Sequence, residues 1–420
     1  MKKRLGIYIH IPFCASKCSY CDFYSLAGCE YLMPDYQKAL TDHLNESAAA
    51  IKNYEVDSIY FGGGTPSFYG ADRIVDILNV LKLNGNVRLD AEVTVECNPD
   101  STSYNALKLM RSEGVNRISL GVQASDNNIL KLIGRRHNFQ QAVKALSDAR
   151  KAGFDNVSMD LIYGLPSQTK TDWANTLSQV MELHPEHISC YGLKLEEGTP
   201  MYRDYYGSPL LPDDDEQADM YSYAAEHLDR FGYKQYEISN FAAPGFESRH
   251  NLKYWNLDDY MGFGPGAHSS VGNQRYSYVK DLKKYIDGVE HDMSIVDEYQ
   301  KIDPLERAVE YIMLGMRTSR GISEREYRIR CQSNWKPIEA VLKAFEKKGW
   351  AQLSGDRWHF TVPGFLVSNA LIGIMLDVQA GERVEGNPWL AEAFAEEEKT
   401  DMPRSEAEII MEQYEQKQDS

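Results

Sequence analysis

The sequence predicts an α/β protein: a partial, TIM-type (β/α)6 barrel followed by a small C-terminal winged-helix-like domain. Three observations predict this architecture. Short β-rich runs alternate with helical stretches over the first half of the 420-residue chain, polar residues fall at the ends of those runs, and a helix-rich segment follows. Because a single core stops growing near about 250 to 300 residues, a chain of this length is expected to hold more than one domain.

Six short runs rich in β-branched and aromatic residues are the predicted strands. They span residues 5–11, 56–61, 91–97, 117–122, 157–162 and 187–193. The stretches between them place apolar residues three and four positions apart, which predicts helices at 35–54, 73–83, 104–112, 139–152 and 172–183. Six such βα units are compatible with a doubly wound sheet or with a full or partial barrel.

The positions of the polar residues favour the barrel. A cysteine loop follows the first predicted strand and a glycine run follows the second, while Glu96 ends the third. Gln123 follows the fourth, Asp160 lies within the fifth and Lys194 follows the sixth. A site built from the carboxyl ends of many successive strands is typical of a barrel, whereas a doubly wound sheet concentrates its site at one switch point. We therefore expect a partial barrel.

Changes in composition and in predicted secondary structure divide the chain into four segments. We expect a barrel with the cofactor sites over residues 1–220, a Tyr-rich elaboration of the barrel over 221–302, the winged-helix-like domain over 303–378 and an acidic, mobile tail over 379–420. The tail holds twelve acidic and four basic residues between Glu382 and Asp419, with few apolar anchors and a short helix expected near 405–416.

The winged-helix-like domain is predicted from three helices and a hairpin. The helices are expected at 305–317, 324–331 and 338–348, and the hairpin strands at 351–353 and 358–361. Elsewhere such modules bind nucleic acid, but a fold does not carry its function with it, and no basic recognition face stands out here. The formal charge of −17 also opposes broad contact with phosphate backbones, so we expect no nucleic-acid partner.

The composition indicates a soluble protein of a reducing compartment. No apolar run approaches the roughly 20 residues of a membrane span, and the basic start at residues 1–4 does not lead into a signal peptide. Seven cysteines are an odd number, and three of them crowd into residues 14–21. We expect a cytoplasmic location; peripheral membrane association stays open, although no amphipathic basic helix supports it.

The crowded cysteines, Cys14, Cys18 and Cys21, form a CxxxCxxC pattern directly after the first strand. Structural zinc takes four ligands, and a second CxxC pair is missing, so zinc is the weaker interpretation. An iron-sulfur cube normally takes four thiolates, so three leave one iron open for a cofactor or substrate. An open iron implies chemistry.

The CxxxCxxC loop, the run Gly62-Gly63-Gly64-Thr65-Pro66 after the second strand and the six βα units together resemble the radical S-adenosylmethionine (radical SAM) superfamily. The resemblance implies that the three thiolates hold a four-iron four-sulfur (4Fe-4S) cluster. It also implies that the open iron binds the amino and carboxylate groups of S-adenosylmethionine, whose sulfonium is cleaved on reduction to a 5′-deoxyadenosyl radical. The glycines would let the backbone approach this ligand closely.

Four further motifs resemble the porphyrin-related branch of that superfamily, and the resemblance covers about residues 5 to 375. They are Glu96-Cys97-Asn98-Pro99, Gly121-Val122-Gln123, Arg135 and the run from Asp160 to Pro166. In this branch Glu96 would meet the ribose hydroxyls or the methionyl amine. The S-adenosylmethionine contacts implied by the resemblance are Tyr8, Tyr20, Gly63, Gly64, Thr65, Glu96, Gln123, Arg135 and Asp160.

Two families of this branch compete. The coproporphyrinogen dehydrogenases are expected to carry a further cysteine two positions after the third ligand, where this chain has Phe23, and a longer segment before the first strand. The run His250-Asn251-Leu252-Lys253-Tyr254-Trp255 instead is similar to the HNxxYW pattern of HemW-like haem chaperones. The resemblance implies haem contact by His250, Asn251, Tyr254 and Trp255, with an imidazole as axial ligand and aromatic rings against the macrocycle. His268 is the next candidate for haem contact, and its loop fits equally well as part of the lining of the S-adenosylmethionine site.

The resulting hypothesis is a haem chaperone that holds a 4Fe-4S cluster and S-adenosylmethionine and delivers haem to recipient proteins such as respiratory enzymes. The alternative is an oxygen-independent coproporphyrinogen III oxidative decarboxylase, or another radical SAM enzyme acting on tetrapyrroles. No catalytic residue is assigned. A low-potential electron donor such as flavodoxin or ferredoxin would be required, and a homodimer is left open. Loss of haem binding without loss of the cluster is the expected effect of His250→Ala.

Overall fold

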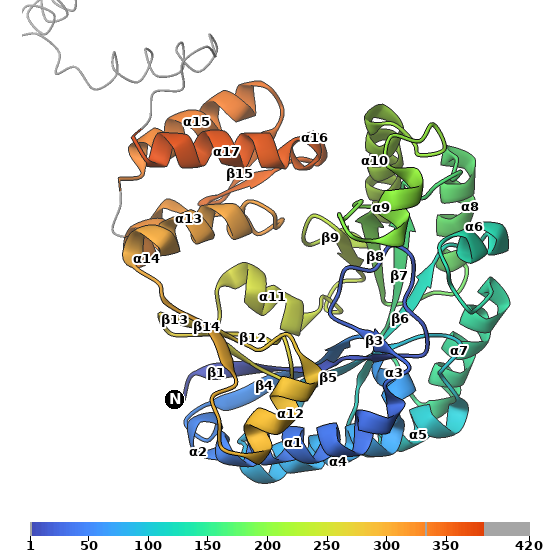
Figure 1. Ribbon diagram of the computed structural model, residues 1–420. Coiled ribbons are helices and arrows are strands. Elements are labelled where there is room, and N and C mark those ends of the chain that lie inside the picture. Colours follow the sequence, from blue (N-terminus) through green and yellow to red (C-terminus); the bar gives the residue numbers. More distant parts are fainter. Residues whose placement is uncertain (1, 332–333, 382–420) are drawn as a thin grey trace, which may run out of the picture.

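The computed structural model describes residues 2–331 and 334–381, and its centre is one strongly curved, twelve-stranded sheet (Figure 1). The strand order is β14-β13-β12-β11-β1-β4-β5-β6-β7-β8-β10-β9, so the sheet has two free edges and is an open barrel. The α/β architecture with a partial barrel is therefore confirmed.

The six predicted strands lie side by side in chain order, each parallel to the next. They are β1 (Arg4–Ile11), β4 (Glu55–Gly63), β5 (Val87–Cys97), β6 (Arg117–Gln123), β7 (Val157–Tyr163) and β8 (His187–Gly192). Side chains alternate between the faces of a strand. In β1, Ile7 and Ile9 belong to the main hydrophobic core, whereas Tyr8 and His10 line a cavity on the opposite face. Strand β1 thus turns its polar side chains toward the cavity and its apolar side chains toward the core.

Helices cover the convex face of the sheet and bury the apolar side chains there (Figure 1). They are α1 (Met33–Glu46), α2 (Ala48–Ile51), α4 (Ala71–Asn84), α5 (Tyr104–Ser112), α7 (Phe139–Ala152), α8 (Lys170–Met181) and α10 (Asp214–Arg230). Shorter helices α3 (Pro66–Tyr69), α6 (Asn127–Leu132) and α9 (Pro200–Tyr205) lie in the connections, with the 3-10 turn η1 (Glu30–Leu32) and the small pair β2 (Phe13–Cys14) and β3 (Leu26–Ala27). The helix expected at 35–54 is divided in two at Ser47.

The segment 221–302 extends the sheet at both edges, which the sequence did not predict. Strand β11 (Tyr260–Phe263) pairs parallel with β1, and β12 (His268–Val271), β13 (Gln274–Tyr278) and β14 (Val296–Lys301) follow it antiparallel. At the other edge, β10 (Asn240–Ala242) pairs antiparallel with β8 and with β9 (Lys234–Gln235). The expected boundary at residue 220 falls inside α10.

Two further helices belong to this segment. Helix α12 (Leu282–Glu290) packs beside α1, whereas α11 (Arg249–Asn256) contacts β4 and α13. The start of α11 is fixed by two side chains. Ser248 accepts a hydrogen bond from the Asn251 N–H, and the buried Glu92 carboxylate accepts bonds from the N–H groups of Arg249 and His250. Such acceptors satisfy the free N–H groups of a helix N-terminus, so α11 is firmly placed.

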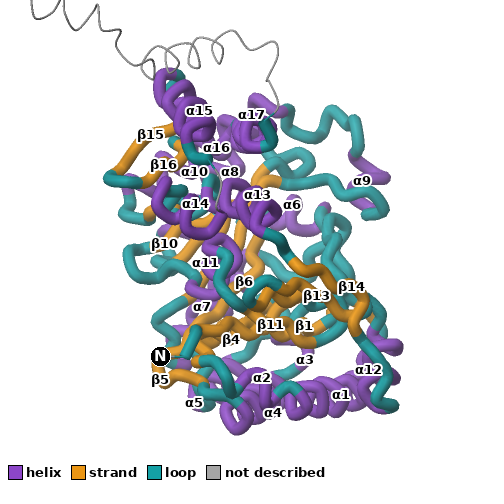
Figure 2. Tube along the Cα trace, turned by 90° about the vertical axis from the view of Figure 1, so that its left-hand side faces the viewer, coloured by secondary structure: helices purple, strands orange, loops and turns teal. Residues whose placement is uncertain are grey.

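The C-terminal module has its own hydrophobic core and sits above the sheet (Figure 2). It contains the expected three helices, α13 (Pro304–Gly315), α14 (Glu324–Cys331) and α15 (Lys336–Lys347), and the hairpin β15 (Ala351–Ser354) and β16 (Arg357–Phe360). Helices α16 (Val362–Leu366) and α17 (Ser368–Gln379) complete it. The tail beyond residue 381, including the helix expected near 405–416, lies outside the described residues. Within the described chain, none of the helices is long and apolar enough to cross a membrane.

Candidate functional site

The three motif cysteines lie on one loop at the carboxyl end of β1. Cys14 is buried at the end of β2, and its Sγ lies 3.3 Å from the Thr65 Oγ1 of the glycine turn. Cys18 and Cys21 are partly exposed, and a turn in which the Cys21 N–H donates to the Cys18 carbonyl joins them. Burial raises the pKa of the Cys14 and Cys21 thiols. A bound metal centre would reverse that effect, because metal coordination deprotonates thiols.

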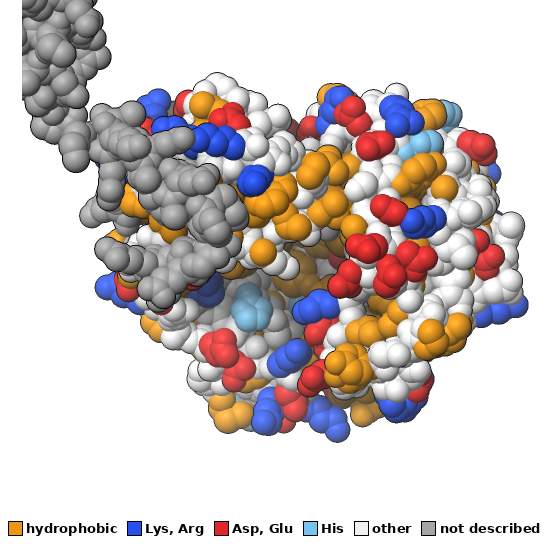
Figure 3. Space-filling view, turned by 90° about the horizontal axis from the view of Figure 1, so that it is seen from above, with side chains coloured by type: hydrophobic (Ala, Val, Ile, Leu, Met, Phe, Trp, Pro, Cys, Tyr) orange, Lys and Arg blue, Asp and Glu red, His pale blue; other side chains and the backbone are white. Residues whose placement is uncertain are grey.

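The thiols do not converge as ligands of a single metal ion. In the part of the chain that the structure describes, no group of three His, Cys, Asp or Glu side chains is close enough to hold one. The three cysteines instead line one edge of a cavity of about 470 Å³, hereafter the main cavity. Figure 3 shows a hollow on this side of the molecule, with charged side chains around its rim.

The glycine turn after β4 is held against the cysteine loop by backbone hydrogen bonds. The Gly64 N–H donates to the Ile11 carbonyl and the Thr65 N–H to the Phe13 carbonyl, both at 2.8 Å. A side chain at Gly64 would place its Cβ 2.7 Å from the Phe13 carbonyl oxygen, and Gly63 has a φ of +110°. Both positions therefore require glycine.

Glu96, at the end of β5, is a buried carboxyl group that faces the main cavity. It accepts hydrogen bonds from the Tyr60 hydroxyl (2.8 Å) and from the Gly63 N–H (3.2 Å). Burial, assisted by the charge of Asp160, raises the pKa of Glu96 to about 7 despite these bonds. The group therefore titrates near neutral pH and is suited to pair with a cationic ligand.

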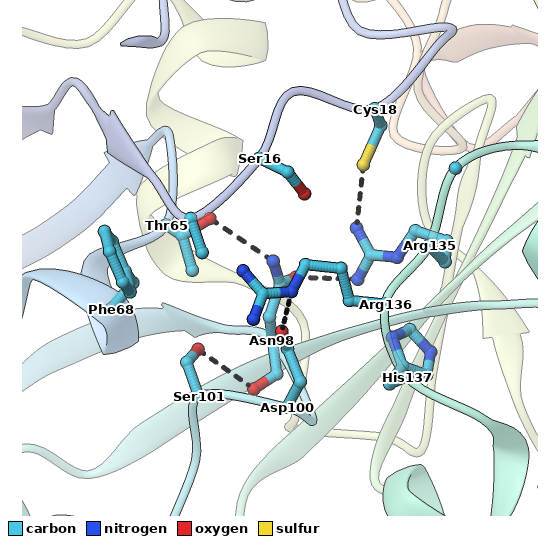
Figure 4. A pocket seen from close by; sticks show the side chains of 12 residues that line it. Ser16, Cys18, Thr65, Phe68, Asn98, Asp100, Ser101, Arg135, Arg136 and His137 are labelled. Atoms are coloured by element: carbon cyan, nitrogen blue, oxygen red, sulfur yellow. Dashed lines mark hydrogen bonds and ion pairs between the residues drawn. The ribbon is translucent and has the colours of Figure 1, made fainter. Parts of the chain in front are cut away.

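Arg135 connects the cysteine loop to the strands (Figure 4). Its Nη2 donates to the Gly121 carbonyl (2.6 Å) and to Asn98 Oδ1 (2.7 Å), and its Nη1 lies 3.6 Å from the Cys18 Sγ. The guanidinium thus places a positive charge beside the Cys18 sulfur.

Asp160, in β7, is surrounded by hydroxyl donors. Its carboxylate accepts hydrogen bonds from Ser119 (2.7 Å), Ser158 (2.9 Å) and Ser189 (2.7 Å). Gln123 is buried nearby at the bulged end of β6, with a φ of +71° that is unusual for a side-chain-bearing residue.

Most of the residues predicted as cofactor contacts line this one cavity. They are Cys14, Cys18, Tyr20, Cys21, Gly63, Gly64, Thr65, Glu96, Gln123, Arg135, Asp160 and, from the HNxxYW run, Asn251. Tyr8 and Tyr254 do not line it. They face a second cavity, also of about 470 Å³, over strands β1, β11, β12 and β13, which shares Asp22 and Phe23 with the main cavity.

His250 lies behind these walls and is completely buried. Its Nδ1 is 2.9 Å from the Ser58 Oγ and its Nε2 is 2.8 Å from the Tyr254 hydroxyl, and the ring stacks on Tyr60. Burial and the nearby charges of Lys253 and Arg117 lower the pKa of His250 to about 3. Trp255 is half-buried on α11 and is among the lining residues of neither cavity.

Arg117 is a residue of the main cavity that the sequence did not predict. It begins β6, is 1% exposed and lines the main cavity, and its Nε has no hydrogen-bond partner among the described residues. The negative charges of Glu92 and Asp160 contribute to a raised pKa of Arg117. The sequence signal that could have identified Arg117 is a charged residue at the start of an otherwise largely apolar strand. His187, which bridges Ser158 and the Tyr236 hydroxyl in the same cavity, gave no such hint.

Comparison with known proteins shows the family to which the chain belongs. Residues 8–180 match the family model of the radical SAM superfamily, and residues 302–367 match that of the HemN C-terminal domain. The chain is 34% identical to the heme chaperone HemW of Bacillus subtilis over 375 residues, covering 88% of this chain and 98% of that protein. It is 32% identical to the heme chaperone HemW of Haemophilus influenzae over 383 residues, covering 89% of this chain and 98% of that protein.

Among solved structures, the coproporphyrinogen III oxidase HemN of Escherichia coli superposes with a TM-score of 0.78 at 23% identity, covering 90% of each chain. At that identity the likeness concerns the fold alone. The relatives of higher identity match over nearly their whole length and span both the barrel and the C-terminal module. This chain therefore belongs to the HemW family of the radical SAM superfamily, whose cofactors are a 4Fe-4S cluster and S-adenosylmethionine.

Proposed function

We propose that the chain is a radical SAM haem chaperone, which binds haem and delivers it to haem-dependent proteins. The observation that carries the proposal is the near full-length similarity to heme chaperones HemW, with 98% of the Bacillus subtilis protein covered. The open arrangement of the hollow supports it, because a carrier must admit and release a large ligand.

The residues around the main cavity fit the two cofactors. Three thiols at one edge suit a cluster held by Cys14, Cys18 and Cys21 with one iron left open. S-adenosylmethionine would lie beside them, against the remaining predicted contacts Tyr20, Gly63, Gly64, Thr65, Glu96, Gln123, Arg135 and Asp160. When bound, cluster and S-adenosylmethionine supply reductive sulfonium cleavage. Tyr8 faces the adjoining second cavity, so its contact with S-adenosylmethionine stays a prediction.

Side chains of the main cavity suit a ligand that carries both a positive and a negative charge. Glu96 offers a carboxylate to a cation, and the Gly63 N–H and the Tyr60 hydroxyl hold that carboxylate in place. Arg135 is anchored by two oxygen acceptors and offers a cation to a carboxylate near Cys18. The glycine turn lets the ligand approach the backbone.

Haem contact by the HNxxYW residues stays a prediction. Asn251 faces the main cavity and Tyr254 the second cavity, so α11 presents the motif between them. Ligation by His250 would require the ring to give up its bond to the Tyr254 hydroxyl or to the Ser58 Oγ. Trp255 would support the haem from its half-buried position on the same helix.

The remaining proposals concern partners and location. We propose recipients such as respiratory haem enzymes and an electron donor such as flavodoxin or ferredoxin. A cytoplasmic location, peripheral membrane contact and a homodimer are further proposals. Coproporphyrinogen III decarboxylation stays the alternative function; the likeness to coproporphyrinogen III oxidase, at 23% identity, concerns the fold and carries no function.

The cofactor site is tested by Cys18→Ser. Removing one of three thiols is expected to abolish most of the cluster, read as iron content and as the visible absorption of the anaerobically reconstituted protein. Cys29→Ser is the matched control, because Cys29 is on the same stretch of chain but does not line the main cavity. Equal iron content in the two variants would refute the assignment.

Chaperone activity is tested by transfer. The full chain, loaded with haem and freed of excess, is mixed with an apo b-type cytochrome, and the Soret band is followed as haem moves. We expect complete transfer within the experiment and haem-free chain at its end. A chain that takes up no haem, or never releases it to the cytochrome, would contradict the proposal.

A further inference from the structure

The inner face of the barrel is built in layers of side chains, and Arg117 lies one layer below Glu96. The sheet register places Tyr60, Thr94 and Arg117 side by side on neighbouring strands, two residues before Glu96 and its neighbour Ser119. Side chains two residues apart point to the same face of a strand, so both layers face the barrel interior. The lower layer is hereafter the floor, and the cysteine loop lies at the opposite end of the main cavity.

Arg117 is a buried cation whose guanidinium is not paired by any residue within 2–331 and 334–381. Only 1% of the residue is exposed, and its Nε is enclosed without an acceptor. In the same part of the chain, no carboxylate lies within ion-pair distance of it and no oxygen accepts a hydrogen bond from it. Burying a charge without a hydrogen-bonded partner is costly. Since Arg117 lines the main cavity, a ligand there can supply that partner.

The polar groups around Arg117 all have hydrogen-bond partners of their own. They are Tyr60, Glu92, Asp160, His187, Tyr236 and His250. The Glu92 carboxylate accepts bonds from two N–H groups of α11, and Asp160 accepts bonds from three serine hydroxyls. Tyr60 donates to Glu96, and both ring nitrogens of His187 and of His250 lie within hydrogen-bond distance of hydroxyl oxygens. The network on the floor is therefore complete without Arg117.

The chemistry of the floor selects a singly charged carboxylate. A guanidinium presents parallel N–H donors that match the two oxygens of a carboxylate. The Thr94 hydroxyl, beside Arg117 in the register, is likewise buried without a partner among the described residues and can donate a further bond. Glu92 and Asp160 add negative charge nearby, which would repel a doubly charged phosphate more strongly than a carboxylate.

The carboxylate of S-adenosylmethionine is not the expected partner of Arg117. In the proposed arrangement it binds the open iron at the cysteine loop, where Arg135 places a cation beside the Cys18 sulfur. Arg135 is fixed to the carbonyl of Gly121, four residues beyond Arg117 on β6. At a rise of about 3.3 Å per residue, that distance is about 13 Å along the strand. One carboxylate cannot pair with both guanidinium groups, so the floor suits a second ligand.

We propose that the floor of the main cavity binds a small carboxylate, held by Arg117, in addition to S-adenosylmethionine. The body of this ligand would lie against the rings of Tyr60, in the same layer, and of His187 and Tyr191, which line the same cavity. The position is that of a substrate, below the predicted contacts of S-adenosylmethionine. This inference goes beyond the haem-chaperone function and does not depend on it.

The test is a calorimetric titration of the full-length, cluster-reconstituted chain at saturating S-adenosylmethionine, with sodium butyrate and its neutral isostere butyramide as probes. Wild type is compared with Arg117→Met, Arg117→Lys and the matched control Arg88→Met, whose arginine pairs with Asp90 at the surface and lines none of the cavities described. We expect one butyrate site in wild type and in Arg88→Met, and at least tenfold weaker binding in Arg117→Met. Butyramide should bind wild type at least tenfold more weakly than butyrate. Arg117→Lys keeps the charge but loses the paired donors, so its butyrate affinity should fall severalfold.

Three results would overturn the inference. Equal butyrate affinity in wild type and Arg117→Met would show that Arg117 does not hold the carboxylate, and equal affinity for butyramide would show that no anion is recognised. Absence of butyrate binding by wild type would show that water alone satisfies the guanidinium. Iron content and S-adenosylmethionine affinity, measured first for each variant, separate these results from a lost cofactor site. Should both Arg117 variants fail to fold, the comparison of butyrate with butyramide in wild type decides.

Discussion

Glu96 shows how burial tunes a single side chain in the main cavity. Its carboxyl group is buried, so the charged form is disfavoured, and the pKa rises to about 7. Three other groups that line this cavity have pKa values shifted away from neutrality: the pKa of Tyr60 and Arg117 is raised further, and that of His187 is lowered. Asp160 adds a second carboxylate, held by three serine hydroxyls.

We predict that affinity for S-adenosylmethionine rises with pH through Glu96. Below pH 7 the group is protonated and must lose its proton to pair with a cationic ligand, whereas above pH 7 it is already charged. The affinity is therefore expected to rise about tenfold between pH 6 and pH 8. Calorimetric titration of wild type beside Glu96→Gln checks this, since the ratio of the two affinities removes the ligand's own titration. A pH-independent ratio would refute the role of Glu96.

Some residues of the candidate site could be predicted from the sequence and others could not. The cysteines, the glycine turn and Glu96 could be predicted because they belong to local motifs at strand ends. The sequence could not predict that Tyr8 and Tyr254 line the second cavity and not the main cavity. Their position depends on how far the sheet extends beyond β1. Likewise, the burial of His250 follows from long-range partners, Ser58 and Tyr60.

At the scale of elements, the six parallel strands were predictable and their flanking strands were not. Strand β11 pairs with β1 although about 250 residues separate them, and no local pattern reports such a pairing. Strands β12 to β14 are rich in Ser, Gln and Tyr and resemble loops in sequence. Helix α10 was also not predicted, although the sequence contains a signal for it. Asp213 and Glu216 form a capping box, a pattern that marks the start of a helix.

The turn after β4 gives the prediction at this scale. In Gly64→Ala the new methyl group would meet the backbone carbonyls of Phe13 and Ile11 at 2.7 and 2.8 Å, and backbone cannot move aside as a side chain can. We expect a fall in stability of about 1–3 kcal/mol, with a lower iron content because the cysteine loop is displaced. Thermal unfolding and iron analysis measure both.

Gly373→Ala is the control for that prediction, since nothing lies within 4 Å of its added Cβ in α17. It should leave the iron content unchanged and stabilise the helix slightly. Equal stability and iron content for Gly64→Ala and wild type would show that the turn tolerates a side chain.

At the scale of the whole molecule, the buried titratable groups determine how stability depends on pH. Burial lowers the pKa of His10, His43 and His137 to about 4 and of His250 to about 3, and that of His187 well below its usual value. Burial raises the pKa of Glu96 and Glu237 to about 7. The histidines favour the folded state at neutral pH and the carboxyl groups favour it in acid.

We predict that the histidines dominate, so that the melting temperature falls between pH 7 and pH 5. At the four histidines whose pKa is lowered to about 4 or about 3, the unfolded chain binds protons from about pH 6.5 downward, whereas the folded chain does not until about pH 4; the pKa of His187 is lowered in the same direction. Each such histidine costs about 2 kcal/mol at pH 5, and each buried carboxyl group returns about 2 kcal/mol over the same interval. With five histidines against two carboxyl groups the balance is a loss.

Circular dichroism melts at the two pH values measure this balance. His43→Gln, which removes one buried imidazole between the Tyr285 and Tyr278 hydroxyls, should show a smaller difference between pH 7 and pH 5. A melting temperature that rises on acidification would show that the carboxyl groups prevail.

Haem binding by the whole, cluster-reconstituted chain is the most direct test of the chaperone function. An anaerobic titration followed at the Soret band is expected to show one haem per chain, bound tightly enough for a sharp end point, and the same preparation should leave coproporphyrinogen III unchanged. No specific haem binding, together with decarboxylation of coproporphyrinogen III, would contradict it.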